Sequence, residues 1–148
     1  HTIYVHARDA SGNWGNANDA IATLTVDKAG PTFSSVSVSP SSAPRQNGNN
    51  AIPVDVTITG TITDNLTGVD TNSGTYTITD SKSNNVVNGT YSIEVDPIDP
   101  LVWHFTINVA ISPQNNGNQN SHRYYNFTIY AADNLGNVGS ATAQFTIQ

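Results

Sequence analysis

Aspartate and asparagine side chains in short turn-like segments are the groups in this sequence that could do chemistry. One segment holds Asp64, Asn65 and Asp70, and another holds Asp133 and Asn137. Carboxylate and amide oxygens are hard ligands that suit Ca²⁺, whereas transition metals favour thiolates, which this chain lacks, and clustered imidazoles. The alternative is that each aspartate accepts hydrogen bonds from the backbone of its own turn. The sequence leaves both interpretations open.

Catalytic groups are hard to find. The four histidines are scattered, and His6 and His104 alternate with apolar neighbours, which predicts exposed strand positions for both. No nucleophile elbow, zinc-binding helix motif or phosphate-cradling glycine loop occurs. Asp96 and Asp99 are close enough in sequence to pair, but the prolines that flank them favour a rigid turn. We therefore predict a protein that is not an enzyme.

The composition is typical of an uncharged, turn-rich extracellular β protein. Charged residues make up 11% of the chain, and the net charge is −6. Lys and Arg together number five, so the chain lacks the basic patch that nucleic-acid binding requires. The absence of Cys excludes disulfides and thiolate zinc sites, and no apolar run in this segment is long enough to span a membrane.

Alternation of apolar and polar residues recurs along the chain, separated by clusters of Asn, Gly, Pro and Asp. The alternating segments are 33–40, 52–63, 74–81, 89–96, 101–111, 123–133 and 141–148. About seven to eight short strands at this spacing predict an all-β antiparallel sandwich or barrel with one wet face on each sheet.

Three positions in these segments stand out. Phe33 has the opposite parity to Val36, so the alternation of the first strand settles only from Val36 onward. Gly60 interrupts the second strand, where it indicates a bulge or a close approach of another group. Trp103 shares the parity of its apolar neighbours, which predicts a core tryptophan.

The sequence repeats itself once. "ARDASGNWGN" begins at Ala7 and "AADNLGNVGS" at Ala131, an offset of 124 residues. Three residues are then lost from the second copy, after which 24–26 matches 145–147. Each copy reads as a hairpin in which Gly and Asn suit positive φ and Asp accepts hydrogen bonds across the turn.

Two further motifs are "DKAGPT" (27–32) and "GTITDNLTGVD" (60–70). Together with the repeated turn they resemble the tandem bacterial and archaeal immunoglobulin-like (Big-type) domains of large cell-surface or secreted proteins. The resemblance implies an immunoglobulin-like β-sandwich over 33–148 and a linker over 28–32. Residues 1–27 would then be the F–G-type hairpin of a preceding, incomplete module, so we expect the sequence to be an excerpt.

The resemblance also implies where the oxygen ligands lie. In such sandwiches the B–C loop and the F–G turn meet at the pole where the chain enters. The residues gathered there would be Asp64, Asn65, Asp70, Asp133, Asn137 and Asp27. We expect Ca²⁺ at this pole, where it would stiffen the joint between modules. The first copy of the turn lacks its partner loops and should bind nothing by itself.

Three N-x-[ST] sequons occur. Asn65 and Asn88 fall in predicted turns and are candidate glycosylation sites, whereas Asn126 falls within a predicted strand.

The function that the resemblance implies is structural or adhesive: a spacer, stalk or assembly unit outside the cell, whose partners are neighbouring modules or other subunits. Two alternatives stay open. One is an accessory, glycan-binding module of a secreted enzyme. The other is a subunit of a self-assembling filament or surface layer with strand or hairpin donation.

Overall fold

The computed structural model describes residues 2–15, 20–24, 26–46, 52–82, 86–112 and 123–148. Every regular element in that part of the chain is a β-strand, so the predicted all-β class is confirmed. The strands are β1 (Thr2–Val5), β2 (Ala20–Thr23), β3 (Thr32–Ser39), β4 (Ser42–Ala43), β5 (Val54–Thr63), β6 (Thr75–Asp80), β7 (Val86–Thr90), β8 (Ile93–Val95), β9 (Val102–Ile111), β10 (Arg123–Ala132) and β11 (Val138–Ile147).

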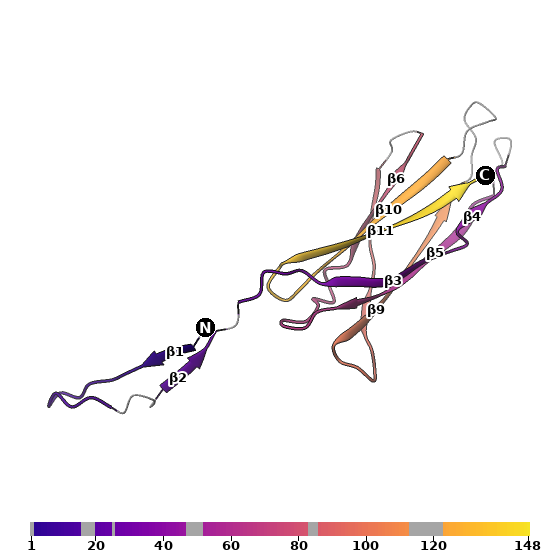
Figure 1. Ribbon diagram of the computed structural model, residues 1–148. Helices are drawn as coiled ribbons and strands as arrows, with labels where there is room; N and C mark the ends of the chain where they lie inside the picture. Colours follow the sequence, from indigo (N-terminus) through magenta and orange to yellow (C-terminus); the bar gives the residue numbers. More distant parts are fainter. Residues whose placement is uncertain (1, 16–19, 25, 47–51, 83–85, 113–122) are drawn as a thin grey trace.

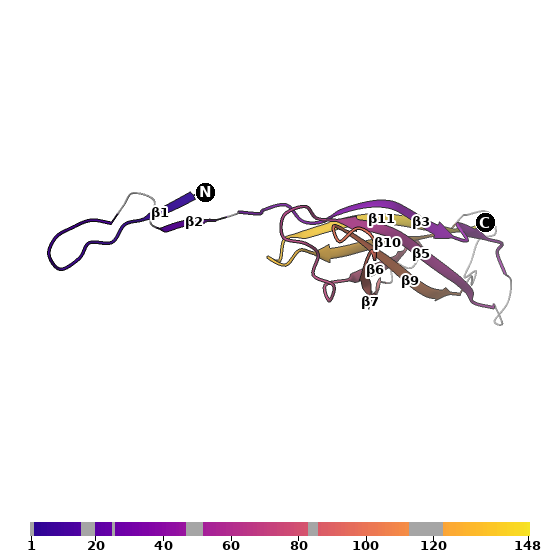
Figure 2. The same cartoon turned by 90° about the horizontal axis from the view of Figure 1, so that it is seen from below.

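Strands β3 to β11 form a sandwich of two sheets (Figures 1 and 2). One sheet has the order β4-β11-β10-β6-β7 and the other has the order β3-β5-β9-β8. All neighbours are antiparallel except β4, which pairs in parallel with the end of β11. The prediction of seven to eight strands was close, because the short β4 and the division of one predicted strand account for the difference.

The divided strand is the segment 89–96, whose alternation predicts one strand. The structure assigns its first part to β7, which pairs with β6, and its second part to β8, which pairs with β9 in the other sheet. Tyr91 lies at the crossing. Its backbone N–H donates to the Gly74 carbonyl at 3.1 Å, its hydroxyl donates to the Tyr130 carbonyl at 2.8 Å, and its ring lies 5.3 Å from that of Phe105. The side chain thus links both sheets where the backbone passes between them.

The parity break in the first strand has a structural cause. The β3–β5 register shifts between Ser34 and Ser37, and Ser35 has a positive φ of 51°. The extra residue of this bulge returns Val36 to the side that Phe33 occupies, and both pack against the core. Gly60 lies opposite this bulge, because Thr61 pairs with Ser34 and Thr59 with Ser37. It also marks a close approach, since an added Cβ would lie 2.6 Å from the Phe105 ring.

The core lies between the two sheets and is built from the inward positions of the long strands. Its fully buried large side chains are Phe127, Phe145, Ile58, Ile62, Ile129 and Val56. Trp103 is buried as predicted. Ile52, in contrast, begins the alternating segment 52–63 but precedes β5 and is exposed, so the prediction that the strand and its buried face begin at this residue was wrong.

Strands β1 and β2 form a separate two-stranded sheet that lies apart from the sandwich in both views (Figures 1 and 2). The alternating apolar residues of this hairpin are exposed: Ile3 is 48%, Val5 52%, Leu24 52% and Val26 51% exposed. This hairpin has the strands and the turn of a sandwich hairpin, but no second sheet in the described part of the chain covers its apolar residues.

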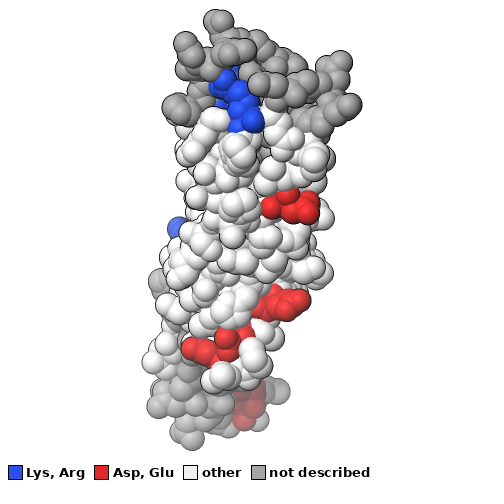
Figure 3. Space-filling view, turned by 90° about the vertical axis from the view of Figure 1, so that its right-hand side faces the viewer, with Lys and Arg blue, Asp and Glu red and all other residues white. Residues whose placement is uncertain are grey.

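Charged side chains are sparse on the surface. The face shown in Figure 3 is mostly formed by uncharged residues, with acidic groups separated from basic ones. Within the described part of the chain, no helix is long and apolar enough to cross a membrane.

Candidate metal centre at the entry pole of the sandwich

Three carboxylates from distant parts of the sequence meet where the chain enters the sandwich. Asp27 lies in the linker before β3, Asp64 follows β5, and Asp133 follows β10. One oxygen from each carboxylate lies within 4.8 Å of the other two. Asp64 is 7% exposed and Asp133 is 2% exposed, while Asp27 is half-buried. Burial of two acidic side chains in one group requires strong hydrogen bonding or a counter-charge.

Asp64 receives hydrogen bonds from its own loop. Its Oδ1 accepts from the backbone N–H groups of Leu66 at 3.1 Å, Thr67 at 2.9 Å and Gly68 at 2.8 Å. The loop can turn this tightly because Gly68 adopts a positive φ of 75°, which costs a glycine little. Gly68 therefore permits the tight turn, and the turn directs three backbone N–H groups toward the Asp64 carboxylate.

Asp133 is held in the same manner by the turn between β10 and β11. Its Oδ1 accepts from the backbone N–H groups of Leu135 and Asn137, both at 2.8 Å, and its Oδ2 accepts from the Asn137 side chain at 2.6 Å. Burial opposes ionisation, but the hydrogen bonds from Asn137 outweigh it, and the pKa of Asp133 is lowered. The Asp133 carboxylate is therefore ionised at neutral pH.

The two loops are fastened to each other through backbone groups. Asn134 donates its backbone N–H to the Gly68 carbonyl at 3.1 Å and its side-chain amide to the Thr67 carbonyl at 2.7 Å. Asp70 donates its backbone N–H to the Ala132 carbonyl at 2.9 Å. These bonds fix the distance between the loops that carry Asp64 and Asp133.

The linker is fastened to both loops. The Thr67 hydroxyl donates to Asp27 Oδ2 at 3.2 Å, and the Asn137 amide donates to the Asp27 carbonyl at 3.3 Å. Further along, the linker backbone passes directly over β11, because a Cβ added to Gly139 would lie 1.8 Å from the Pro31 carbonyl oxygen. The sandwich thus holds the linker at three places.

The spacing of the three carboxylates suits ligands of one hard divalent cation. Ca²⁺ takes six to eight oxygen ligands at about 2.3–2.6 Å, so two ligands of one ion lie up to about 5 Å apart. The three carboxylates satisfy this limit. The Thr67 hydroxyl lies beside them and adds a further oxygen atom, whereas Asn137 faces Asp133 Oδ2 with its amide nitrogen. A cation would also relieve the mutual repulsion of the carboxylates.

The structure brings together part of the expected ligand set. Asp27, Asp64 and Asp133 form the group, and Asn137 bonds to two of them. Asn65 is exposed, and among the described residues no hydrogen bond joins it to the three carboxylates.

Asp70 lies outside the carboxylate group, and its Oδ1 instead accepts from the Asn72 backbone N–H at 2.9 Å. Thr67 was not among the predicted ligands. The signal that could have identified it is its hydroxyl in the same loop, three residues after Asp64.

The first copy of the turn has the same local geometry without the partner loops. The Asn13 backbone N–H donates to Asp9 Oδ1 and its side-chain amide donates to Asp9 Oδ2, both at 2.9 Å. These bonds from Asn13 lower the pKa of Asp9. In the part of the chain that the structure describes, Asp9 belongs to no group of three or more candidate ligands.

The pair Asp96 and Asp99 forms the turn that the flanking prolines predict. Asp96 Oδ1 accepts from the backbone N–H groups of Ile98 at 2.7 Å and Asp99 at 3.0 Å, and Asp99 Oδ1 accepts from that of Leu101 at 3.0 Å. Asp96 Oδ2 lies 2.7 Å from His104 Nε2, and this contact is the main cause that lowers the pKa of Asp96 to about 2. Both carboxylates thus serve the turn between β8 and β9.

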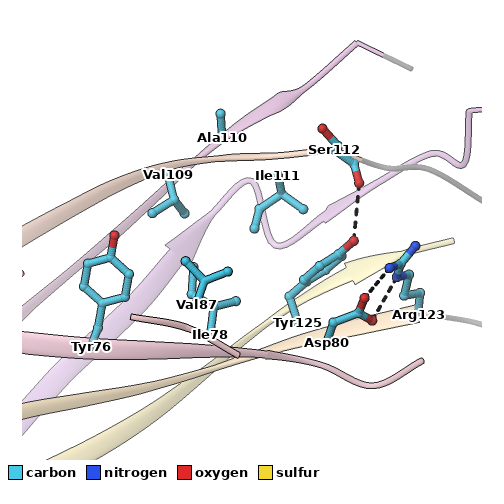
Figure 4. A pocket seen from close by; sticks show the side chains of 10 residues that line it. All are labelled: Tyr76, Ile78, Asp80, Val87, Val109, Ala110, Ile111, Ser112, Arg123 and Tyr125. Carbon is cyan, nitrogen blue, oxygen red and sulfur yellow. Dashed lines mark hydrogen bonds and ion pairs between the residues drawn. The ribbon is translucent and has the colours of Figure 1, made fainter. Parts of the chain in front are cut away.

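A cavity of about 440 Å³ lies between the two sheets, near the ends of β6 and β9 (Figure 4). Apolar side chains from β6, β7 and β9 line most of it. Its polar groups bond one another: Arg123 pairs with Asp80, and the Tyr125 hydroxyl donates to the Ser112 carbonyl at 3.3 Å. These pairings stabilise the wall of the cavity.

The candidate glycosylation sites lie in different settings. Asn65 is exposed in the loop after β5, as predicted. Asn88 is exposed but lies in the edge strand β7, so the prediction of a turn there was wrong. Asn126 lies in β10, as predicted, and accepts a hydrogen bond from the Gln144 amide at 2.8 Å.

The sequence predicts a long polar loop over 112–122, and apart from Ser112 this segment lies outside the described residues. Comparison with models of known protein families gave no match, and comparison with curated protein sequences gave no significant match.

Proposed function

We propose that the chain is a non-catalytic structural link of an extracellular multi-domain protein, built from tandem immunoglobulin-like modules. The observation that carries this proposal is the fastening of the linker. Asp27 bonds to Thr67 and Asn137, and Pro31 lies against β11, so the sandwich holds the segment that connects it to the preceding hairpin. A spacer or stalk needs such fixed joints, because a free linker would let successive modules swing.

The Asn-, Thr- and Ser-rich composition without Cys supports an extracellular or cell-surface location for this link. A bound cation completes the proposal. Ca²⁺ at Asp27, Asp64 and Asp133 would join linker and loops by direct ligation, in addition to the hydrogen bonds. In the absence of the cation the joint would keep its hydrogen bonds but lose stiffness.

Thermal unfolding of the whole chain tests the cation. A ligand at about 100 times its Kd stabilises the native state by about 2.7 kcal/mol, which raises Tm by on the order of 10 °C for a domain of this size. We expect calcium to raise Tm and a chelator to reverse the rise. Asp64→Asn should abolish the response, and Asp9→Asn, the matched change in the first copy, should leave it intact.

An equal Tm with calcium and with chelator would contradict the cation. Retention of the full calcium response in Asp64→Asn would show that calcium binds elsewhere. Magnesium in the same titration distinguishes a calcium site from a general effect of divalent charge.

A second candidate function has one observation in its favour. The exposed apolar face of β1–β2 suits a filament or surface-layer subunit that donates this hairpin to a neighbour. Analytical ultracentrifugation separates the two functions, because a donating subunit would form concentration-dependent polymers and a simple link would stay monomeric.

A further inference from the structure

The pairing of β1 with β2 repeats that of β10 with β11, residue for residue. Thr2 pairs with Thr23 in the first hairpin, and Asn126 pairs with Gln144 in the second. The first strands are therefore offset by 124 residues and the second strands by 121. These are the offsets of the sequence repeat, including its loss of three residues. Every described position of the hairpin consequently has an equivalent in the sandwich.

The equivalents of the exposed apolar residues lie in the deepest part of the core. Ile3, Val5, Leu24 and Val26 are half exposed, and they correspond to Phe127 at 0%, Ile129 at 0%, Phe145 at 0% and Ile147 at 2% exposed. In the sandwich, this face of β10–β11 packs inward against the sheet of β3, β5, β9 and β8. The structure therefore shows, within the same chain, what covers such a face.

Gly15 provides an independent indication. It corresponds to Gly139, over which the linker backbone passes so closely that any side chain would clash with Pro31. Gly15 itself is exposed, and its backbone N–H donates to the Ala7 carbonyl at 2.9 Å, as a strand residue does. Glycine weakens a strand unless another backbone must approach closely. A linker that crosses Gly15 would supply that reason.

We propose that the apolar face of β1–β2 is an interaction surface for strands equivalent to β3–β9 of a second, like module. This module precedes the hairpin in the parent chain, and its own linker crosses Gly15. The inference rests on the proposed tandem link and extends it, since it names the partner of the hairpin. It does not depend on the cation.

A chimera tests the proposal. Residues 28–124 are fused directly before residue 1, so that a second set of β3–β9 precedes β1 at the spacing of the repeat. Amide hydrogen exchange of β1 and β2 is then compared with that in the 148-residue chain, both in the presence of a chelator. If the added strands close over the hairpin, its amides should exchange on the order of 100-fold more slowly.

Two variants make the result decisive. Gly15→Val should remove the protection in the chimera, because the linker can no longer cross, and should leave the exchange of the 148-residue chain unchanged. The combined variant Ile3→Phe, Val5→Ile, Leu24→Phe and Val26→Ile gives the hairpin the inner face of β10–β11. This variant is a control for side-chain size, because it shows whether the added strands fail to close over the hairpin only where its original side chains do not fit their inner face.

Protection of the hairpin that Gly15→Val abolishes would support the proposal. Unprotected amides in both the chimera and its refitted variant would overturn it. Self-association of the 148-residue chain that Val5→Ser abolishes, and that the exposed Tyr4→Ser leaves intact, would also overturn it, because the hairpin would then be covered by a second copy. If the hairpin of the chimera is protected but calcium does not change its Tm, the covering of the hairpin is supported and only the proposed calcium site fails.

Discussion

The two hairpins of this protein share a turn but differ in almost everything that packing determines. Asp9 and Asp133 each accept a backbone and a side-chain hydrogen bond from the asparagine four residues later, and Gly12 and Gly136 have φ values of 95° and 87°. Yet β10–β11 forms the centre of a core, and β1 is exposed on both faces. The local sequence D-x-x-G-N therefore determines the geometry of the turn, whereas the burial of the hairpin depends on the strands that surround it.

The largest contrast is expected from truncation of equivalent apolar residues. Phe127→Ala removes a fully buried ring and should lower the free energy of unfolding by about 3–5 kcal/mol. Ile3→Ala, at the equivalent position, should change it by less than about 0.5 kcal/mol because the side chain is exposed. Urea unfolding of both variants measures the difference. Equal losses would mean that the hairpin is covered in solution.

A smaller contrast is expected from the glycines at the linker crossing. Gly139→Ala would place a methyl group against the Pro31 carbonyl and should destabilise the sandwich by about 1–3 kcal/mol. Gly15→Ala should leave the unfolding of the sandwich unchanged. Thermal unfolding of the two variants is the measurement, and a Gly139→Ala variant as stable as the parent would show that the linker does not lie across β11.

The smallest contrast concerns pH. The pKa of Asp133 is lower in the folded state than in the unfolded state, so its contribution is present above the unfolded pKa, near 3.8. That contribution is lost as the pH falls through the lowered folded pKa. Asp133→Asn should therefore lower stability at pH 7 and flatten its decline below about pH 4. Asp9→Asn should leave the profile of the sandwich unchanged.

Urea unfolding from pH 7 to pH 2 gives these profiles. Asp96 titrates in the same acidic range in every variant, so the comparison uses differences from the parent chain. Parallel profiles for Asp133→Asn and the parent would contradict the role assigned to this carboxylate.

Much of the fold could be predicted from the sequence because alternation reports which face of a strand is buried. Trp103, Phe127 and Phe145 all lie where their parity places them. The segment 89–96 shows the limit of this signal. Its alternation continues while the chain passes from one sheet to the other, since both sheets bury the side that faces the core. The strand pairing reveals the crossing, and the contacts of Tyr91 mark the point where it occurs.

The sequence predicts part of the candidate site, because aspartates follow the ends of strands that meet at the same pole of the sandwich. Asp64 and Asp133 follow strands that the alternation reveals, and Asp27 lies in a linker motif. Asp70 has the same chemistry and the same loop but turns to the Asn72 backbone instead. The side-chain direction within an irregular loop depends on its backbone hydrogen bonds, which residue types alone do not specify. Thr67 was missed for the same reason.

The proposed joint requires a linker that is fixed to the sandwich while the hairpin before it is not. Backbone ¹⁵N relaxation of the whole chain measures this directly at Lys28, Ala29 and Gly30. We expect order parameters of about 0.85 at these amides, equal to those of β10 and β11. This expectation holds whether or not the hairpin moves relative to the sandwich. Values below about 0.6, even with calcium present, would show a free linker and would contradict the proposed fixed joint.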